Sequence, residues 1–300
     1  MTRQIRGVLT AIVTPFDAAG AVCPERLRTQ VRRQLKHDNG IFCNGTNGEF
    51  FVLNQEEKLL VTRTCVDEVS GKVPVVAHIG EISTAATIKL GKEVAAMGVD
   101  AVSVISPYFV PLKQHELIYH YTAVADAVPV PVFLYNIPAR TGNTIEPATA
   151  AKLAEHPNII GIKDSAGSYE SLKGYLDAVR NIAGFDVLSG PDHLAHQGFL
   201  EGCSACISGL ANVSPEGVSL IWKHFRDGNI DKSKAAQDFI GNLRKDLYAV
   251  AFAPAAVKKA AALLGEDVGE SRYPIVFSAD DLATIKNIAA RYATVPALSL

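Results

Sequence analysis

The sequence predicts an α/β protein, a (β/α)8 TIM barrel followed by a C-terminal helical extension. Eight short apolar runs rich in β-branched residues recur between residues 7 and 210, stretches of helical length separate them, and no further strand-like run follows. Apolar strands that alternate with helices build a parallel sheet covered by those helices. Eight such units close into a barrel.

The expected elements follow one another regularly. The first helix carries Leu27, Val31 and Leu35 at four-residue spacing, and the second begins at Asn54, where Glu57 three residues later makes a capping box. The predicted strands are 7–13, 40–45, 73–79, 100–106, 131–137, 159–164, 186–190 and 205–210. The predicted helices are 24–38, one from Asn54, 83–97, 114–127, 146–155, 168–182, 192–201 and 215–227.

We divide the chain into a catalytic barrel over residues 1–228 and a helical extension over 229–300 that packs on it. The extension is expected to hold about three helices, with no strand between them. A doubly wound open sheet is the structural alternative. That fold places a glycine-rich dinucleotide-binding turn after its first strand. The segment TPFDAAG after the first predicted strand is not such a turn.

Composition narrows the class of protein. The 300 residues are 48% hydrophobic and 20% charged, and the net charge of −2 does not favour nucleic acid or an anionic membrane as partner. No apolar run approaches the roughly 20 residues that span a bilayer. The basic residues before the first strand lead to no cleavage site, so we expect a strand there and not a signal peptide.

The cysteines point to a reducing compartment. Their number, five, is odd, which predicts free thiols in a cytoplasmic protein. Cys203 and Cys206 form a CxxC pair, but a redox or metal role needs a thioredoxin-like context or a second ligand pair. We therefore interpret these two as small, partly buried side chains, and we expect no metal site.

The sixth predicted strand ends in NIIGIKDS, which brings Lys163 to the end of an aliphatic run. Active sites of barrel enzymes lie at the carboxyl ends of the strands. A lysine withdrawn from water loses stabilisation of its charge, so its pKa falls. A neutral amine attacks a ketone or aldehyde and forms a Schiff base. The alternative is a lysine paired with Asp164 or extended toward solvent.

Other strand ends carry suitable partners. In the loop Gly45-Thr46-Asn47-Gly48, backbone N–H groups and two polar side chains can converge on a carboxylate, although a plain turn would use the same glycines. Tyr135 can relay protons or serve as a core tyrosine. Arg140 can hold a carboxylate through two hydrogen bonds, or can be a solvated loop residue.

Together these motifs resemble the dihydrodipicolinate synthase / N-acetylneuraminate lyase family of pyruvate-dependent aldolases. The likeness runs nearly end to end through TAIVTPFD, GTNGEF, SPYF, YNIPARTG, GIKDS, LSGPD and ISGLANV. YNIPxxTG followed by GIKDS is the specific part. The resemblance implies a (β/α)8 barrel with extra C-terminal helices, a homotetramer made of two tight dimers, and a small-molecule 2-keto acid such as pyruvate with an aldehyde as the partners.

The resemblance also implies roles for single residues. Lys163 matches the lysine that forms the imine with pyruvate, and Tyr135 the tyrosine that shuttles protons. Thr46 and Asn47 fall where the family binds the keto-acid carboxylate, and Thr46 is also expected to be catalytic, as the threonine of the family's Tyr–Thr–Tyr proton relay. Gly190 and Ile207 match positions that line the pyruvate site. Because the imine forms on the protein's own amine, no metal or organic cofactor is expected.

Three departures from the synthase pattern stand out. Asn47 replaces the second threonine of GTTGE, and Phe109 replaces a tyrosine that completes a proton relay across the dimer interface. The positions that bind the feedback inhibitor lysine hold different residues, namely Gln55, Lys58 and Ala86. Arg140, in contrast, matches the arginine that holds the carboxylate of the aldehyde.

The sequence therefore favours a Schiff-base aldolase or lyase similar to dihydrodipicolinate synthase. An aldolase or dehydratase acting on 2-keto-3-deoxy sugar acids is the first alternative, because it needs the same lysine and the same carboxylate loop. A 2-keto-acid-binding relative without turnover is the second, since Phe109 cannot carry a proton. A phosphate-handling barrel enzyme is the third, with Ser189-Gly190 and Ser208-Gly209 in the loops that often hold phosphate.

Overall fold

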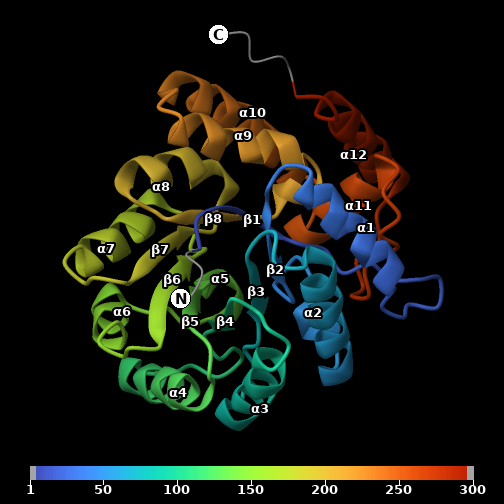
Figure 1. The fold of residues 1–300 in the computed structure, drawn as a ribbon. Coiled ribbons are helices and arrows are strands. Elements are labelled where there is room, and N and C mark those ends of the chain that lie inside the picture. Colours follow the sequence, from blue (N-terminus) through green and yellow to red (C-terminus); the bar gives the residue numbers. More distant parts are fainter. Residues whose placement is uncertain (1–4, 296–300) are drawn as a thin grey trace. The chain divides into compact units, whose positions relative to one another are not determined.

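The computed structural model describes residues 5–295. Its eight strands form a closed barrel in the order β1 to β8 (Figure 1), which confirms the predicted fold class. The chain divides into two compact units, one made of residues 74–207 with the start of the chain, the other of residues 7–73 with 208 onward. Each unit is described by itself. The predicted boundary near residue 228 lies inside the second unit and stays a prediction.

The first unit contains the strands from β3 onward, and each of β3 to β7 is followed by a helix on the outer side of the sheet (Figure 1). Its elements are β3 (Val75–His78), α3 (Thr84–Ala95), β4 (Ala101–Ile105), α4 (Gln114–Ala127), β5 (Val132–Asn136), α5 (Pro138–Thr141), α6 (Pro147–Leu153), β6 (Ile159–Asp164), α7 (Tyr169–Val179), β7 (Asp186–Ser189), the 3-10 turn η2 (Asp192–Leu194), α8 (Ala195–Glu201) and β8 (Ala205–Ser208). β4 and β5 are buried along their whole length, because parallel strands between helices have no solvent face.

The second unit holds the first two strand–helix repeats and the helical extension. Its elements are β1 (Gly7–Ala11), α1 (Pro24–Leu35), β2 (Gly40–Cys43), η1 (Phe50–Val52), α2 (Gln55–Val69), η3 (Leu210–Asn212), α9 (Pro215–Arg226), α10 (Ile230–Tyr248), α11 (Ala253–Leu263) and α12 (Ala279–Arg291). The three helices α10 to α12 are the extension that the sequence predicted, and α10 packs against both α9 and α11.

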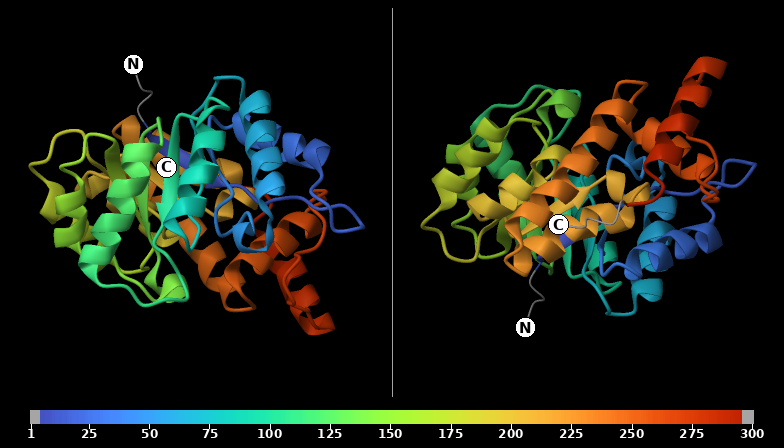
Figure 2. Two further views of the ribbon diagram at one scale, coloured as in Figure 1. Left: turned by 90° about the horizontal axis from the view of Figure 1, so that it is seen from below. Right: turned by 90° about the horizontal axis from the view of Figure 1, so that it is seen from above.

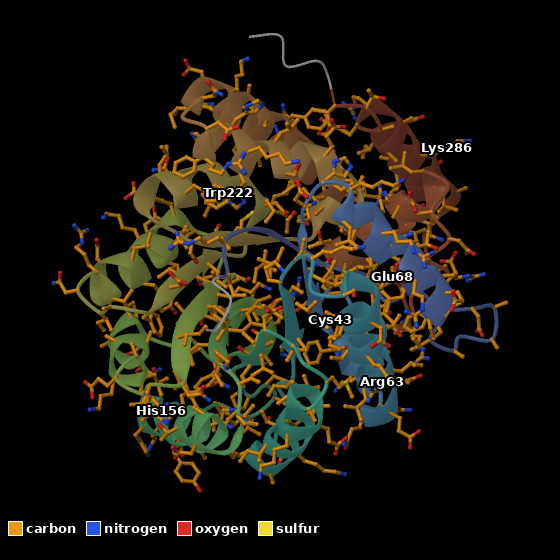
Figure 3. The ribbon with its side chains drawn as sticks, in the orientation of Figure 1. Cys43, Arg63, Glu68, His156, Trp222 and Lys286 are labelled. Atoms are coloured by element: carbon orange, nitrogen blue, oxygen red, sulfur yellow. The ribbon has the colours of Figure 1, made fainter. Side chains whose placement is uncertain are left out.

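Helices α1 and α2 lie side by side (Figures 1 and 2). The predicted capping box is present at the start of α2, where Asn54 accepts from the Glu57 backbone N–H and Glu57 accepts from that of Asn54. At the other end of α2, Glu68 faces α1 (Figure 3) and accepts from Arg32 Nε at 2.6 Å. The cap satisfies backbone groups at the start of α2, and the ion pair links its other end to α1.

Most predicted helices have the expected places, with ends that differ by a few residues. The predicted strands 40–45 and 205–210 are shorter in the structure, because their last residues leave the sheet in turns. The expected helix 192–201 is divided into η2 and α8. The short helix α5 was not predicted. Within the described part of the chain, no helix is both long and apolar enough to cross a membrane.

Candidate active site

Lys163 is the centre of the candidate site. It is the fifth residue of β6, and its side chain is only 4% exposed. Its Nζ lies 3.8 Å from the centroid of the Tyr135 ring, so the amine stands over the face of the phenol. Tyr135 is the residue paired with Lys163 on the neighbouring strand β5, and it is itself 2% exposed. The structure thus brings together the two residues that carry most of the predicted chemistry.

Asp164 does not face the amine. Successive residues of a strand point to opposite sides of the sheet, so Asp164 points away from the side occupied by Lys163. Its Oδ1 accepts hydrogen bonds from Asn136 Nδ2 at 2.8 Å and from the Ala166 backbone N–H at 3.1 Å. Burial raises the pKa of Asp164, and these hydrogen bonds oppose that rise. The alternative in which Asp164 neutralises Lys163 is therefore wrong.

Gly190 and Ile207 belong to the same face of the sheet as Lys163. Lys163 pairs with Leu188 on β7, and Leu188 pairs with Ala205 on β8, so these three residues share one face. Every second residue of a strand lies on the same face. Gly190, two residues after Leu188, and Ile207, two residues after Ala205, therefore lie on it as well. A Cβ on Gly190 would lie 2.0 Å from Ser165 Oγ and 2.6 Å from the Asp164 carbonyl oxygen. Only glycine permits this close approach beside the lysine.

The loops after β4 and β5 are tied together by a residue that the sequence did not single out. Asn143 Nδ2 donates to the carbonyl oxygens of Pro107 and Val110 at 2.7 and 2.8 Å, and its Oδ1 accepts from the Leu112 backbone N–H at 2.8 Å. Asn143 therefore holds the segment that carries Tyr108 and Phe109. A buried asparagine just after a helix-ending glycine was the available signal, and it is a weak one.

The other predicted residues of this unit have different environments. Arg140 lies on α5, five residues after Tyr135, with its side chain exposed. Phe109 is 93% exposed and has a left-handed backbone with φ of 75°. Tyr108 is half-buried, and burial raises the pKa of its phenol. His78, at the end of β3, packs edge-to-face against Tyr135 with 5.9 Å between ring centroids, a neighbour that the sequence did not indicate.

Thr46 and Asn47 lie in the second unit, in the loop after β2. Both are partly exposed, whereas the residues on either side are buried. Thr14 Oγ1 donates to the Gly48 carbonyl oxygen at 2.7 Å. The Asn47 side chain packs on Gly209, where an added Cβ would lie 2.8 Å from Nδ2. The loop is thus held from the segment after β1 and from the residues after β8, and both of its polar side chains are partly exposed.

The cysteines show no feature of a reactive pair. Cys203 and Cys206 are buried free thiols, and burial raises the pKa of Cys203 to about 12 and that of Cys206 further still. A thiol with a raised pKa is a poor nucleophile and a poor metal ligand at neutral pH. Across residues 5–295, no cluster of three or more histidine, cysteine, aspartate or glutamate side chains is arranged to hold a metal ion.

Comparison with known proteins identifies the family of the chain. The model of the dihydrodipicolinate synthetase family matches residues 4–290. A 4-hydroxy-tetrahydrodipicolinate synthase of Pelobacter propionicus is 35% identical over 91% of this chain and 93% of its own length. An uncharacterised DapA-like lyase of Halobacterium salinarum is also 35% identical, over 92% of this chain and 90% of its own.

A solved structure gives the same answer for the fold. The chloride-inhibited dihydrodipicolinate synthase from Acinetobacter baumannii, complexed with pyruvate, has a TM-score of 0.91 and 32% identity, and the match covers 97% of this chain and 99% of that one. Both the sequence match and the structural match run over nearly the whole chain. The chain belongs to the dihydrodipicolinate synthetase family.

Proposed function

We propose that this protein is a Schiff-base aldolase that forms an enamine from pyruvate on Lys163 and adds it to an aldehyde bearing a carboxylate, such as aspartate semialdehyde. The observation that carries the proposal is the pairing of Lys163 with Tyr135. A lysine 4% exposed, with its Nζ 3.8 Å from a tyrosine ring at the carboxyl ends of two barrel strands, has the position and partner of a reactive amine.

The chemistry follows from the amine. Neutral Lys163 Nζ attacks C2 of the keto acid, and the resulting carbinolamine takes up a proton and loses water to leave a protonated imine. The imine withdraws electrons from C3, so a C3 proton departs and an enamine forms. The enamine carbon attacks the aldehyde carbon, and hydrolysis releases the product and regenerates the amine. We assign to Tyr135, whose ring contacts Nζ, the transfer of protons in the addition and dehydration steps.

Two further groups support the choice of substrates. The loop with Thr46 and Asn47 offers hydroxyl, amide and backbone N–H donors, as a keto-acid carboxylate requires. Arg140 is exposed beyond Tyr135 and can bind a carboxylate on the second substrate. The relative from Acinetobacter baumannii was solved with pyruvate, in keeping with the first of these substrates.

The departure at Phe109 bears on the proton path. Its exposed ring carries no hydroxyl, so it cannot pass a proton to Tyr135. Tyr108, the adjacent residue, and solvent are the remaining donors, and with them the mechanism keeps the same intermediates. The proposed cytoplasmic location and tetrameric assembly stay predictions that rest on the family likeness.

The proposal is tested by trapping the imine. Purified protein is incubated with pyruvate and borohydride, digested, and mapped by mass spectrometry, with Lys163→Met as the variant and Lys259→Met as a matched lysine control. We expect a reduced pyruvate adduct on the peptide that contains Lys163, in wild type and control only. Turnover is then assayed with aspartate semialdehyde and with a panel of 2-keto-3-deoxy sugar acids. Turnover of the sugar acids without turnover of aspartate semialdehyde would contradict the synthase reaction and support the sugar-acid alternative.

A further inference from the structure

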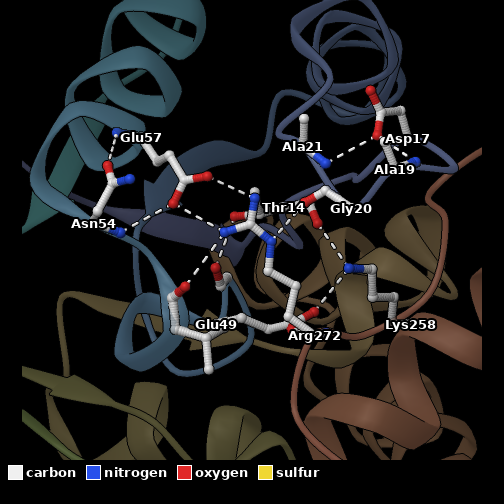
Figure 4. A network of polar contacts seen from close by, with 12 residues as sticks. Thr14, Asp17, Ala19, Gly20, Ala21, Glu49, Asn54, Glu57, Lys258 and Arg272 are labelled. Atoms are coloured by element: carbon white, nitrogen blue, oxygen red, sulfur yellow. Dashed lines mark hydrogen bonds and ion pairs between the residues drawn. The ribbon is translucent and has the colours of Figure 1, made fainter.

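Another buried lysine, Lys258, lies in the network of Figure 4, and the proposed reaction does not use it. Lys258 on α11 is 1% exposed, and its Nζ donates to Glu49 Oε1 at 2.7 Å and to the Thr14 carbonyl oxygen at 2.8 Å. Glu49 is fully buried. Removing both charges from water costs about as much as their attraction returns. A stabilising role alone therefore does not explain why this pair is buried.

The pair belongs to a larger cluster. The other carboxylate oxygen of Glu49 accepts from the Arg272 backbone N–H at 3.0 Å. The Arg272 side chain binds Glu57 through two nitrogens, at 2.6 and 2.9 Å. The Phe16 ring lies 3.9 Å from Lys258 Nζ and 4.2 Å from Arg272 Cζ, so one aromatic ring contacts both cations. The cluster thereby joins the segment after β1, the start of α2 and the C-terminal region of the unit.

The same cluster fixes one end of the loop that carries Thr46 and Asn47. Glu49 ends this loop in a left-handed conformation with φ of 60°, and Asn44 begins it with φ of 55°. Such conformations are unfavourable for residues other than glycine and persist only where contacts enforce them. The conformation of Asn44 is held by its side chain, whose Nδ2 donates to Lys58 O and Thr62 Oγ1, both at 2.9 Å. The conformation of Glu49 is held by its hydrogen bonds from Lys258 and Arg272.

We propose that Glu49 and Lys258 are positioning residues, whose buried ion pair holds the loop with Thr46 and Asn47 in the conformation that binds the substrate carboxylate. The inference deepens the proposed function and rests on it. Neither residue touches the substrate. Lys258 acts by bonding Thr14 and Glu49 at once, while Thr14 Oγ1 bonds Gly48 O, so the end of the loop is held at two successive residues.

The pair is expected to respond to pH. Burial lowers the pKa of Lys258 to about 8, with Glu49 and Glu270 acting to raise it and Arg272 acting to lower it further. As the pH rises through this value, the ammonium loses its proton and the charge-assisted bond to Glu49 is lost. Binding of the keto acid should then weaken. Arginine at position 258 stays charged throughout this range.

The test compares Glu49→Gln, Lys258→Met and Lys258→Arg with Lys259→Met. The control removes the ion pair of the next residue on α11, whose partner Glu270 is exposed. Two quantities are measured: the pyruvate concentration that half-saturates borohydride trapping, and hydrogen exchange of the peptide covering residues 44–49. We expect Glu49→Gln and Lys258→Met to raise the half-saturating concentration by about tenfold or more and to speed exchange, with the amount of adduct trapped at saturating pyruvate changed less. The control should match wild type.

The pH series compares wild type with Lys258→Arg, so it requires only that this one variant folds. In wild type, the half-saturating pyruvate concentration should rise above about pH 8, and in Lys258→Arg this rise should be absent. Folded Glu49→Gln and Lys258→Met variants with wild-type half-saturation and exchange would overturn the inference, as would a flat pH profile in wild type. A wild type that forms no pyruvate adduct would instead overturn the proposed function, and with it the substrate role of the loop.

Discussion

Gly161 of β6 is a position where a single added methyl group should be poorly tolerated. It lies two residues before Lys163, on the same face of the strand. A Cβ built on Gly161 would lie 2.4 Å from the Asp186 carbonyl oxygen and 2.6 Å from Phe133 Cε1. Both distances are well below van der Waals contact, so Gly161→Ala requires the neighbouring atoms to move.

The loss of stability caused by Gly161→Ala depends on which neighbouring atoms move. The Phe133 ring can rotate or shift, but the carbonyl belongs to the backbone of β7, where Asp186 is the partner of Gly161 in the sheet. Overpacking a core costs about 1–3 kcal/mol, and a backbone contact places this variant at the upper end, about 3 kcal/mol. Displacement of β6 against β7 would also move Lys163, so the rate of pyruvate trapping should fall.

Urea unfolding measures the free-energy difference, and borohydride trapping measures the effect on the amine. Gly241→Ala is the control, because Gly241 lies within α10 and an added Cβ there meets no atom within 4 Å. Alanine should stabilise that helix by up to about 1 kcal/mol. A Gly161→Ala variant as stable as wild type, with normal trapping, would refute the packing described for β6 and β7.

Three other predictions concern titration and specificity. Burial lowers the pKa of His120 to about 4. As the pH falls, His120 of the unfolded chain therefore takes up a proton at a higher pH than His120 of the folded protein. Stability should drop by at most about 3 kcal/mol between about pH 6.5 and pH 4, and His120→Gln should drop less in urea unfolding over the same range. Burial raises the pKa of Asp164, so its ionised form costs stability at neutral pH. Asp164→Asn should therefore be more stable than wild type at pH 7 by urea unfolding, with the gain lost as the pH falls through the raised pKa; a loss of stability at pH 7 would contradict this. Arg140→Leu should raise the KM for the carboxylate-bearing aldehyde by about tenfold or more and leave pyruvate trapping unchanged; a changed trapping reaction would mean that Arg140 serves the keto acid.

Periodic patterns made the fold predictable, and the strand ends made the candidate residues predictable. Lys163 and Tyr135 could be singled out separately, but their contact depends on the register of β5 and β6, which no local pattern specifies. The interpretation of Asp164 as the possible partner of Lys163 failed for the same reason. Adjacent residues in sequence attract attention as a pair, although a strand directs them to opposite sides.

Long-range polar contacts were the least predictable feature. In the sequence, Lys258 only interrupts an alanine-rich stretch, and its partner Glu49 lies 209 residues earlier. The last predicted strand, 205–210, was too long for the same reason. Residues Leu210–Asn212 form the turn η3 and not sheet, because Asn212 bonds the backbone of Val13 and Ala11 at 3.0 and 2.8 Å. Such contacts form between segments that only the folded chain brings together.

The most direct test of the proposed chemistry asks which lysine reacts. Lys163 and Lys258 are both strongly buried, and the Nζ of each lies close to an aromatic ring, 3.8 Å from the centroid of Tyr135 and 3.9 Å from that of Phe16. Lys258 is engaged by Glu49, and we expect it to be inert. Borohydride reduction with pyruvate, followed by peptide mapping, should find the adduct on Lys163 alone and none in Lys163→Met. An adduct on Lys258, or no adduct on either lysine, would contradict the Schiff-base mechanism proposed for this site.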